Sequence, residues 1–259
     1  MIVTGSLPAG EAPSCAPGTS LLASIDVEWT KNYRVKDGNV PFCFSVAWLA
    51  LRSGDSAVTD TTKFWCTSAY VEDDRERGDL ITAASSALEC IASHASLVTG
   101  HQLCSDLSVL AASADGKPAA IETARNAWRQ RRQAGPGQPA YLDTRYDAGH
   151  LLACQSRRLV DVCADLRLDV TQPELRGASM TALHRRWTEH GDTTAREKIT
   201  VLNLRHSLST AIVAARAAGL AHWQPGLNVN GMLAAELGNT IGWAASPAFT
   251  ALLGDSGAA

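Results

Sequence analysis

The stretch Leu21-Leu22-Ala23-Ser24-Ile25-Asp26-Val27-Glu28-Trp29-Thr30 is an apolar run that ends in two carboxylates one residue apart. Alternate side chains of a β-strand point to the same face, so we expect Asp26 and Glu28 to lie side by side. Two like charges this close repel each other, and a hard divalent cation between them would relieve the repulsion. The alternative is an exposed strand end with two solvated carboxylates, because charged residues are common there.

Two more strand-like runs follow, at residues 40–51 and 63–71. Turn-forming residues at 37–39 and 53–55 separate the three runs, which predicts an antiparallel meander. From residue 79 to 97 the apolar residues recur at spacings of three and four, as in an amphipathic helix packed on a sheet. The first third of the chain therefore predicts three strands followed by a helix.

A short buried strand from residue 97 leads through Gly100 to a predicted helix that carries Asp106 in its first turn and runs to about residue 112. The helix dipole favours a carboxylate at that position, although Asp106 could instead serve as an N-terminal cap. The remaining pattern predicts a strand at 141–144 and helices at 119–133, 157–166, 179–190, 194–218 and 232–237. Strands early and helices late predict an α/β fold in which helices flank a mixed β-sheet.

The composition is that of a compact globular protein. The chain has 259 residues, of which 46% are hydrophobic and 19% charged, enough for one large core. The net charge of −3 offers no overall positive field for nucleic acid, but leaves a local basic groove possible. Seven cysteines with no C-x-x-C pair favour reduced thiols over a disulfide framework or a zinc site.

The two ends of the chain differ from its middle. Residues 1–19 are rich in glycine and proline and predict a flexible leader, while residues 221–259 form a turn-rich extension expected to pack back on the domain at 20–220. No apolar run is long enough for a membrane span, and the start of the chain lacks a signal-peptide pattern. These features predict a cytoplasmic protein that does not contact a membrane.

Four motifs in this order resemble the DEDD superfamily of 3′–5′ exonucleases, in particular its proofreading and RNase T-like branch. Asp26 and Glu28 match the first motif, and Gly100-His101-Gln102-Leu103-Cys104-Ser105-Asp106-Leu107 matches the second. Tyr141-Leu142-Asp143-Thr144 is similar to the family's strand ending in Asp-Thr, and Arg205-His206-Ser207-Leu208-Ser209-Thr210-Ala211 occupies the place of the third motif. The resemblance spans about residues 20–220.

This resemblance implies a ribonuclease H-like fold and a metal-dependent exonuclease that hydrolyses phosphodiester bonds at the ends of single-stranded DNA or RNA. Asp26, Glu28 and Asp106 would hold two ions, Mg²⁺ or Mn²⁺, that stabilise the attacking and leaving oxygens. His206 would be the general base, a role that suits its ordinary pKa of about 6.5. The alternative for His206 is a histidine that packs or caps at a helix surface.

The third motif departs from the family pattern. A fourth carboxylate is expected about five residues after the histidine, where this chain has Thr210-Ala211. A hydroxyl is a poor ligand for a hard dication, so at least one ion would be held more weakly. Asp143, Asp147 or Asp192 would supply the missing charge if the fold brings one of them close.

Two other functions therefore stay open. A catalytically impaired nuclease fold could serve as a nucleic-acid binding or scaffolding module, and an unrelated α/β enzyme could carry the Asp-x-Glu pair by accident. Among candidate substrate-binding residues, Trp29 could stack on a terminal base or fill the core, and His101 could be a structural loop residue instead. Phosphate contacts or ordinary solvated faces are the two interpretations of the basic residues Lys31, Arg34, Lys36, Arg125, Arg129, Arg131 and Arg132.

Overall fold

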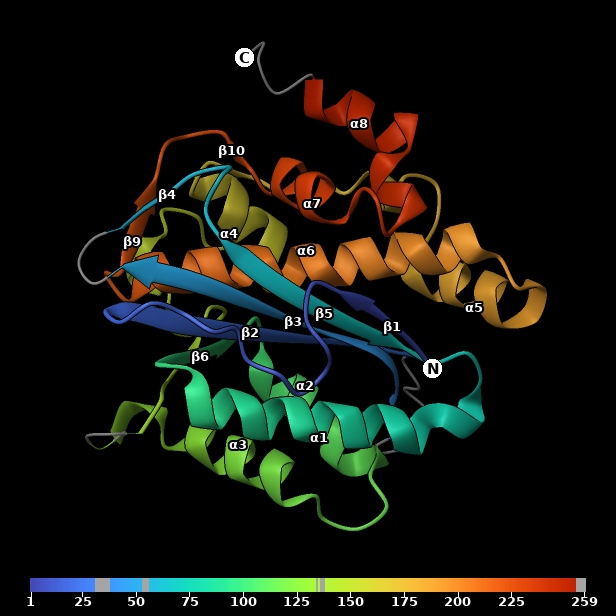
Figure 1. Ribbon diagram of the computed structural model, residues 1–259, viewed down its shortest axis with the longest axis horizontal. Helices are drawn as coiled ribbons and strands as arrows, with labels where there is room; N and C mark the ends of the chain where they lie inside the picture. The colour runs from blue at the N-terminus through green and yellow to red at the C-terminus, as the bar shows by residue number, and fades with distance from the viewer. Residues whose placement is uncertain (31–37, 53–55, 134, 136–137, 255–259) are drawn as a thin grey trace.

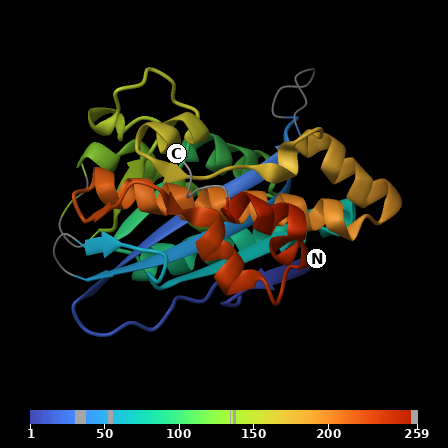
Figure 2. The same cartoon turned by 90° about the horizontal axis from the view of Figure 1, so that it is seen from above.

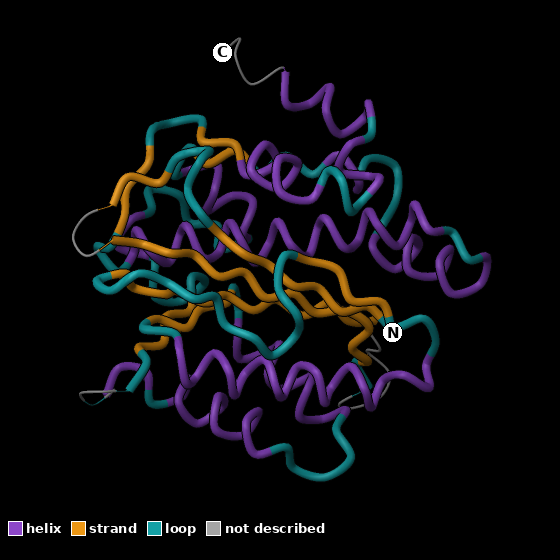
Figure 3. Tube along the Cα trace, viewed as in Figure 1, coloured by secondary structure: helices purple, strands orange, loops and turns teal. Residues whose placement is uncertain are grey.

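The computed structural model describes residues 1–30, 38–52, 56–133, 135 and 138–254. A six-stranded sheet forms the middle layer, with helices on both faces (Figures 1 and 3). The helices are α1 (Arg77–His94), α2 (Leu103–Ser113), α3 (Ala119–Arg129), α4 (Leu159–Asp165), α5 (Met180–His190), α6 (Thr193–Ala217), α7 (Val229–Leu237) and α8 (Pro247–Gly254).

The sheet is mixed. Its strands in spatial order are β1 (Ile2–Gly5), β5 (Phe64–Tyr70), β3 (Val40–Arg52), β2 (Thr19–Thr30), β6 (Leu97–Gly100) and β7 (Ala140–Asp143). The neighbours from β1 to β2 are antiparallel, whereas β6 runs parallel to β2 and β7 parallel to β6. The predicted meander of three strands is confirmed, and so is the general α/β class.

Short strands outside the main sheet were not predicted. They form two parallel pairs, β4 (Ser56–Val58) with β9 (Ala221–Trp223) and β8 (Leu168–Asp169) with β10 (Leu227–Asn228). Strands of two or three residues are too short to show a period in the sequence. The predicted turn at 53–55 lies outside the described residues.

The prediction of a flexible leader is corrected at residues 2–5, which form the edge strand β1. Ile2 pairs with Tyr70 and Gly5 with Thr67, so β1 satisfies backbone groups along the edge of β5. A Cβ on Gly5 would lie 2.1 Å from the Cys66 carbonyl oxygen, and only glycine fits this approach. The Gly- and Pro-rich composition of the surrounding residues concealed a four-residue strand.

Two hydrophobic clusters pack on opposite faces of the sheet. Along β2, the side chains of Ala23, Ile25 and Val27 join the cluster beneath α1, α2 and α3, whereas Leu22 joins the cluster around α6. This alternation follows from the period of two in a strand. It directs the intervening polar side chains of β2 toward α6.

Helix α6 lies between the sheet and the C-terminal part of the chain. It contacts β2, β3 and β5 on one side and α4 and α7 on the other, and it runs obliquely across the strands (Figure 2). Most of its side chains are therefore buried around its whole circumference.

None of the helices among the described residues is both long enough and apolar enough to cross a membrane. All seven cysteines are free thiols, as predicted.

Candidate metal centre

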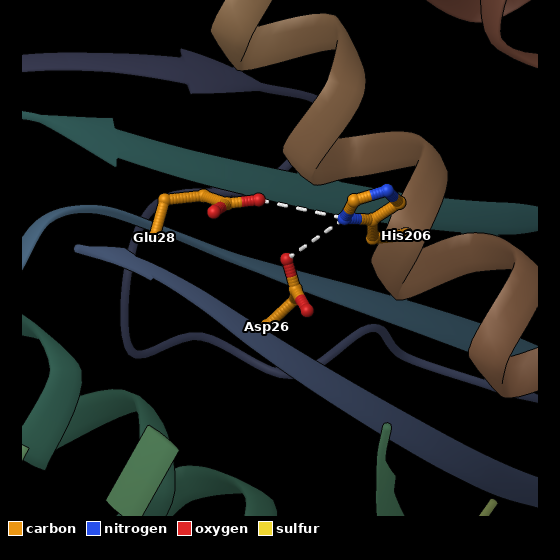
Figure 4. A group of neighbouring side chains, drawn as sticks. All are labelled: Asp26, Glu28 and His206. Carbon is orange, nitrogen blue, oxygen red and sulfur yellow. Dashed lines mark ion pairs between the residues drawn. The ribbon is translucent and has the colours of Figure 1, made fainter. Parts of the chain in front are cut away.

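Three side chains that could bind a metal converge at the carboxyl end of β2. Asp26 and Glu28 extend from β2 and His206 from α6, and both carboxylates point at the imidazole (Figure 4). His206 Nδ1 lies 3.5 Å from Asp26 Oδ2 and 3.4 Å from Glu28 Oε1. One ligand atom from each residue lies within 4.8 Å of those of the other two. The structure thus brings together the first motif and the histidine of the third.

The local structure of β2 explains this placement. The two carboxylates share one face because they are two residues apart in a strand. β2 pairs with β6 only over Leu22–Ser24, so the last residues of β2 continue past the end of β6. A β-bulge between Glu28 and Trp29 then shifts the register of β2 against β3. Bulges of this kind redirect side chains, and Trp29 lines the same cleft as Glu28.

The charges of the three groups are strongly coupled. Burial and the neighbouring Asp26 raise the pKa of Glu28 to about 7, although His206 opposes this shift. Burial by itself lowers the pKa of His206, but hydrogen bonds with both carboxylates outweigh it and raise that pKa to about 10. The imidazolium therefore balances the two carboxylates and lies where a bound cation would compensate the same charges.

Two further residues hold this arrangement in place. Asn203 donates from Nδ2 to Asp26 Oδ2 at 2.6 Å and to the Asp26 carbonyl at 3.2 Å. Gln172 lies 2.9 Å from the other ring nitrogen of His206, Nε2. Neither was predicted. Asn203 lies one turn before His206 on the same helix face, so helical spacing could have revealed it, whereas the distance of Gln172 in the sequence gives no signal.

A buried ion pair anchors the segment that carries Gln172. Glu174, in the short 3₁₀ helix Pro173–Leu175, accepts hydrogen bonds from both terminal nitrogens of Arg205. Both side chains are fully buried. Arg205 Nε also donates to Asn230 Oδ1, and Asn230 in turn donates to the Thr171 carbonyl at 2.9 Å. Because Arg205 precedes His206, this network fixes Gln172 against the site.

Asp106 lies in the same cleft, which has a volume of about 730 Å³ and is lined by Asp26, Glu28, Asp106 and His206 among others. Its side chain is only 3% exposed, and Oδ2 has no hydrogen-bond partner among the described residues. Burial and the charges of Asp26 and Glu28 raise its pKa well above the ordinary value. Since α2 begins at Leu103, Asp106 lies inside the helix rather than at the capping position.

The second motif forms a tight turn between β6 and α2. A Cβ on Gly100 would lie 2.9 Å from the Cβ of Leu103, so the turn has no room for a side chain. Gln102 adopts a left-handed conformation with φ of 68°. Asp143 stabilises this turn, because its carboxylate accepts hydrogen bonds from the backbone N–H of Gln102 and Arg145 and from Trp128 Nε1.

The fourth carboxylate is not replaced by any of the three aspartates considered from the sequence. Asp143 is occupied at the turn, Asp147 is paired with Arg131 at 2.6 Å, and Asp192 caps the first turn of α6 through Ala195 N. The corresponding positions on α6 are also inaccessible. Thr210 and Ala211 are buried, and Ala211 belongs to the hydrophobic cluster around α6. The possible replacement by Asp143, Asp147 or Asp192 is therefore corrected: each of these carboxylates has a structural partner.

The two candidate substrate-binding residues both line the cleft. His101 Nδ1 lies 2.9 Å from Thr144 Oγ1, and Nε2 lies 2.9 Å from the Arg157 carbonyl. Burial lowers the pKa of His101 to about 4, so the neutral ring is held by the fold at both nitrogens. Trp29 is half-buried and packs against the cluster beneath α1. Contact of either residue with substrate stays a prediction.

The basic residues give little support to a phosphate-binding groove. Lys31, Arg34 and Lys36 lie outside the described residues. On the other basic segment, Arg125 pairs with Glu122, and Arg131 and Arg132 approach Asp147. Their charges are therefore partly neutralised within the fold.

Comparisons of this chain with family models, with curated proteins and with solved structures found no match.

Proposed function

We propose that this chain is a metal-dependent 3′–5′ exonuclease that acts at the ends of single-stranded DNA or RNA. The observation that carries the proposal is the convergence of Asp26, Glu28 and His206 at one wall of a cleft that also holds the unpartnered carboxylate of Asp106. A ribonuclease H-like fold is supported by the mixed sheet with β2 inside it and helices on both faces.

The donor set fits hard divalent cations. Carboxylate oxygens suit Mg²⁺ and Mn²⁺, and Asp26, Glu28 and Asp106 would hold the ions. Ions bound there would neutralise a phosphodiester and activate the attacking water. Asn203 keeps the Asp26 carboxylate oriented, and Asp106 lines the same cleft with its Oδ2 unpartnered among the described residues.

The described lining of the cleft also predicts how substrate binds. It contains three carboxylates and neither lysine nor arginine among the described lining residues. A polyanion would be repelled by these carboxylates unless cations intervene. Nucleic acid should therefore bind in this cleft only together with divalent ions, with Trp29 available to stack on a terminal base, an interaction of about 1–3 kcal/mol.

Labelled single strands test this function directly. The protein is incubated with 5′-labelled DNA and RNA oligonucleotides and Mn²⁺ or Mg²⁺, and the products are separated by length. We expect a ladder of strands shortened from the 3′ end, lost on chelation and in Asp26→Asn and Asp106→Asn. Asp60→Asn, which changes an exposed carboxylate away from the cleft, is the matched control and should cleave normally. Cleavage that persists in Asp26→Asn would exclude this site.

The second candidate is an impaired nuclease fold that binds nucleic acid without cutting it. It is favoured by the buried Thr210 and Ala211, which leave no carboxylate at the fourth position. In that case the oligonucleotides would be retained at full length but shift in a mobility assay. Absence of both cleavage and binding would contradict both candidates.

A further inference from the structure

We infer that His206 is a metal ligand in this chain, so that Asp26, Glu28 and His206 form a mixed oxygen and nitrogen site that prefers transition-metal ions to Mg²⁺. This inference rests on the proposed function, because it assigns the ion that the nuclease site would use. It replaces the role of general base expected for His206 from the resemblance.

His206 Nδ1 is spaced from the two carboxylates as ligand atoms are around a single metal ion. A metal with bonds of about 2.0–2.2 Å places neighbouring ligand atoms about 3.0–3.5 Å apart. His206 Nδ1 lies 3.5 Å from Asp26 Oδ2 and 3.4 Å from Glu28 Oε1, within this range. The Asp26 and Glu28 oxygens lie within 4.8 Å of each other, so a single ion could contact one ligand atom of each residue. A general base would instead face a water molecule beyond the ion.

The environment of the second ring nitrogen carries the next step. Histidine ligands nearly always use the other ring N–H to hydrogen-bond an acceptor that fixes the ring. The amide nitrogen of Gln172 lies 2.9 Å from His206 Nε2, and a flip of this amide, whose oxygen and nitrogen are interchangeable, places the oxygen there as the acceptor. The buried Arg205–Glu174 pair holds the segment of Gln172 in position. The ring is thus oriented so that Nδ1 is left for the carboxylate side.

The same cleft contains a third carboxylate, that of Asp106, which would be stabilised by a nearby positive charge. Asp106 is 3% exposed, with Oδ2 unpartnered among the described residues. A cation bound between Asp26 and Glu28 would compensate the negative charge of this neighbouring carboxylate in the cleft. Neither Thr210 nor Ala211 can contribute a ligand, so His206 is the group on α6 that completes the first ion's coordination.

Ligand chemistry then predicts the preference among metals. Imidazole nitrogen suits later transition metals such as Zn²⁺, whereas Mg²⁺ and Mn²⁺ favour oxygen ligands, and affinity for mixed ligand sets rises from Mn²⁺ to Co²⁺. A site with two carboxylates and one imidazole should therefore bind Co²⁺ and Zn²⁺ more tightly than Mg²⁺. We expect the affinity to rise from Mg²⁺ to Mn²⁺ and from Mn²⁺ to Co²⁺.

Calorimetric titration of the whole chain with Mg²⁺, Mn²⁺ and Co²⁺, without nucleic acid, tests this assignment. We expect His206→Ala to lower Co²⁺ affinity at least about tenfold and to reduce the preference for Co²⁺ over Mg²⁺. Gln172→Ala should lower it by about 10- to 100-fold, as is usual for partners of a ligating histidine. His190→Ala, which removes an exposed histidine at the end of α5, should change nothing.

A metal affinity that rises or stays unchanged in His206→Ala would overturn the inference. If His206 is only a counter-ion, His206→Ala removes a competing positive charge, and metal affinity should rise or stay unchanged. A second measurement needs no variant: on addition of Zn²⁺ to ¹⁵N-labelled wild-type protein, the Nδ1 resonance of His206 should move to the position of a metal-bound nitrogen while Nε2 keeps its proton. An unshifted Nδ1 with Zn²⁺ bound contradicts the assignment.

The two proposals fail separately. Metal binding as expected, without cleavage of oligonucleotides, would remove the nuclease and leave the ligand assignment standing. Cleavage with unchanged metal affinity in His206→Ala would leave the nuclease and remove the ligand assignment.

Discussion

Replacing Glu174 with alanine would leave the guanidinium of Arg205 buried without its carboxylate. Both side chains are fully shielded from water, and Glu174 accepts from both terminal nitrogens of Arg205. Removing one partner of such a pair costs about 3–5 kcal/mol, because the remaining charge keeps its desolvation penalty. We expect the free energy of unfolding of Glu174→Ala to fall by about this amount in urea titrations followed by circular dichroism.

The double variant Glu174→Leu with Arg205→Met separates the charge from the packing. Replacing both charged groups by apolar side chains is often neutral or stabilising, so the double variant should lose less stability than Glu174→Ala alone. The exposed pair of Arg185 and Glu189 provides a matched control, since Glu189→Gln should change stability by about 0.5 kcal/mol or less. A loss below about 1 kcal/mol in Glu174→Ala would refute the reasoning, as would a double variant that is the less stable of the two.

Three other substitutions test individual buried contacts of the fold. Burial lowers the pKa of His184 from 6.5 to about 4, so the unfolded chain takes up its proton first and stability is lost as the pH falls from about 6.5 to 4. In unfolding measured at pH 7 and pH 4, His184→Gln, which can still bond the Tyr70 hydroxyl, should remove about 2 kcal/mol of this loss. A loss of stability that is unchanged in the variant would contradict this role of His184. Gly100→Ala should destabilise by about 1–3 kcal/mol, because the new methyl group collides with Leu103, and a neutral effect on the melting temperature would show that the turn can relax. Asp143→Ala deprives three N–H groups of their acceptor and should cost about 2–4 kcal/mol in urea, with a loss under about 1 kcal/mol arguing against a structural role.

Much of the fold follows from short-range patterns. The strands that became β2, β3 and β5 alternate or run apolar between turn formers, and α1 repeats its apolar residues at helical spacing. These periods are properties of neighbouring residues, so they can be recognised without knowing what packs against them. The placement of Asp26 and Glu28 on one face follows from the same argument. Strand β1 could not be recognised in this way, because a strand of four residues that pairs with a distant edge is too short to show a period.

The partners of these carboxylates come from elsewhere in the chain. Asn203, 177 residues beyond Asp26, orients its carboxylate, and Gln172 approaches His206 from a separate segment. Similarly, Asp143 had the sequence context of a possible ligand, but the fold uses it to hold the turn at Gln102. A sequence pattern shows which side chains could bind a ligand. It does not show which hydrogen-bond donors from distant segments contact those side chains in the fold.

The amino-acid sequence by itself determined the α/β class, the order of the main elements and the two adjacent carboxylates, because each depends on local periodicity or on strand geometry. The tertiary structure decided that Nδ1 of His206 faces both carboxylates, that Asp106 is left without a partner in the same cleft, and that Thr210 and Ala211 are buried. These features depend on how α6 packs across the sheet, and contacts between such distant segments leave no signature in either segment alone.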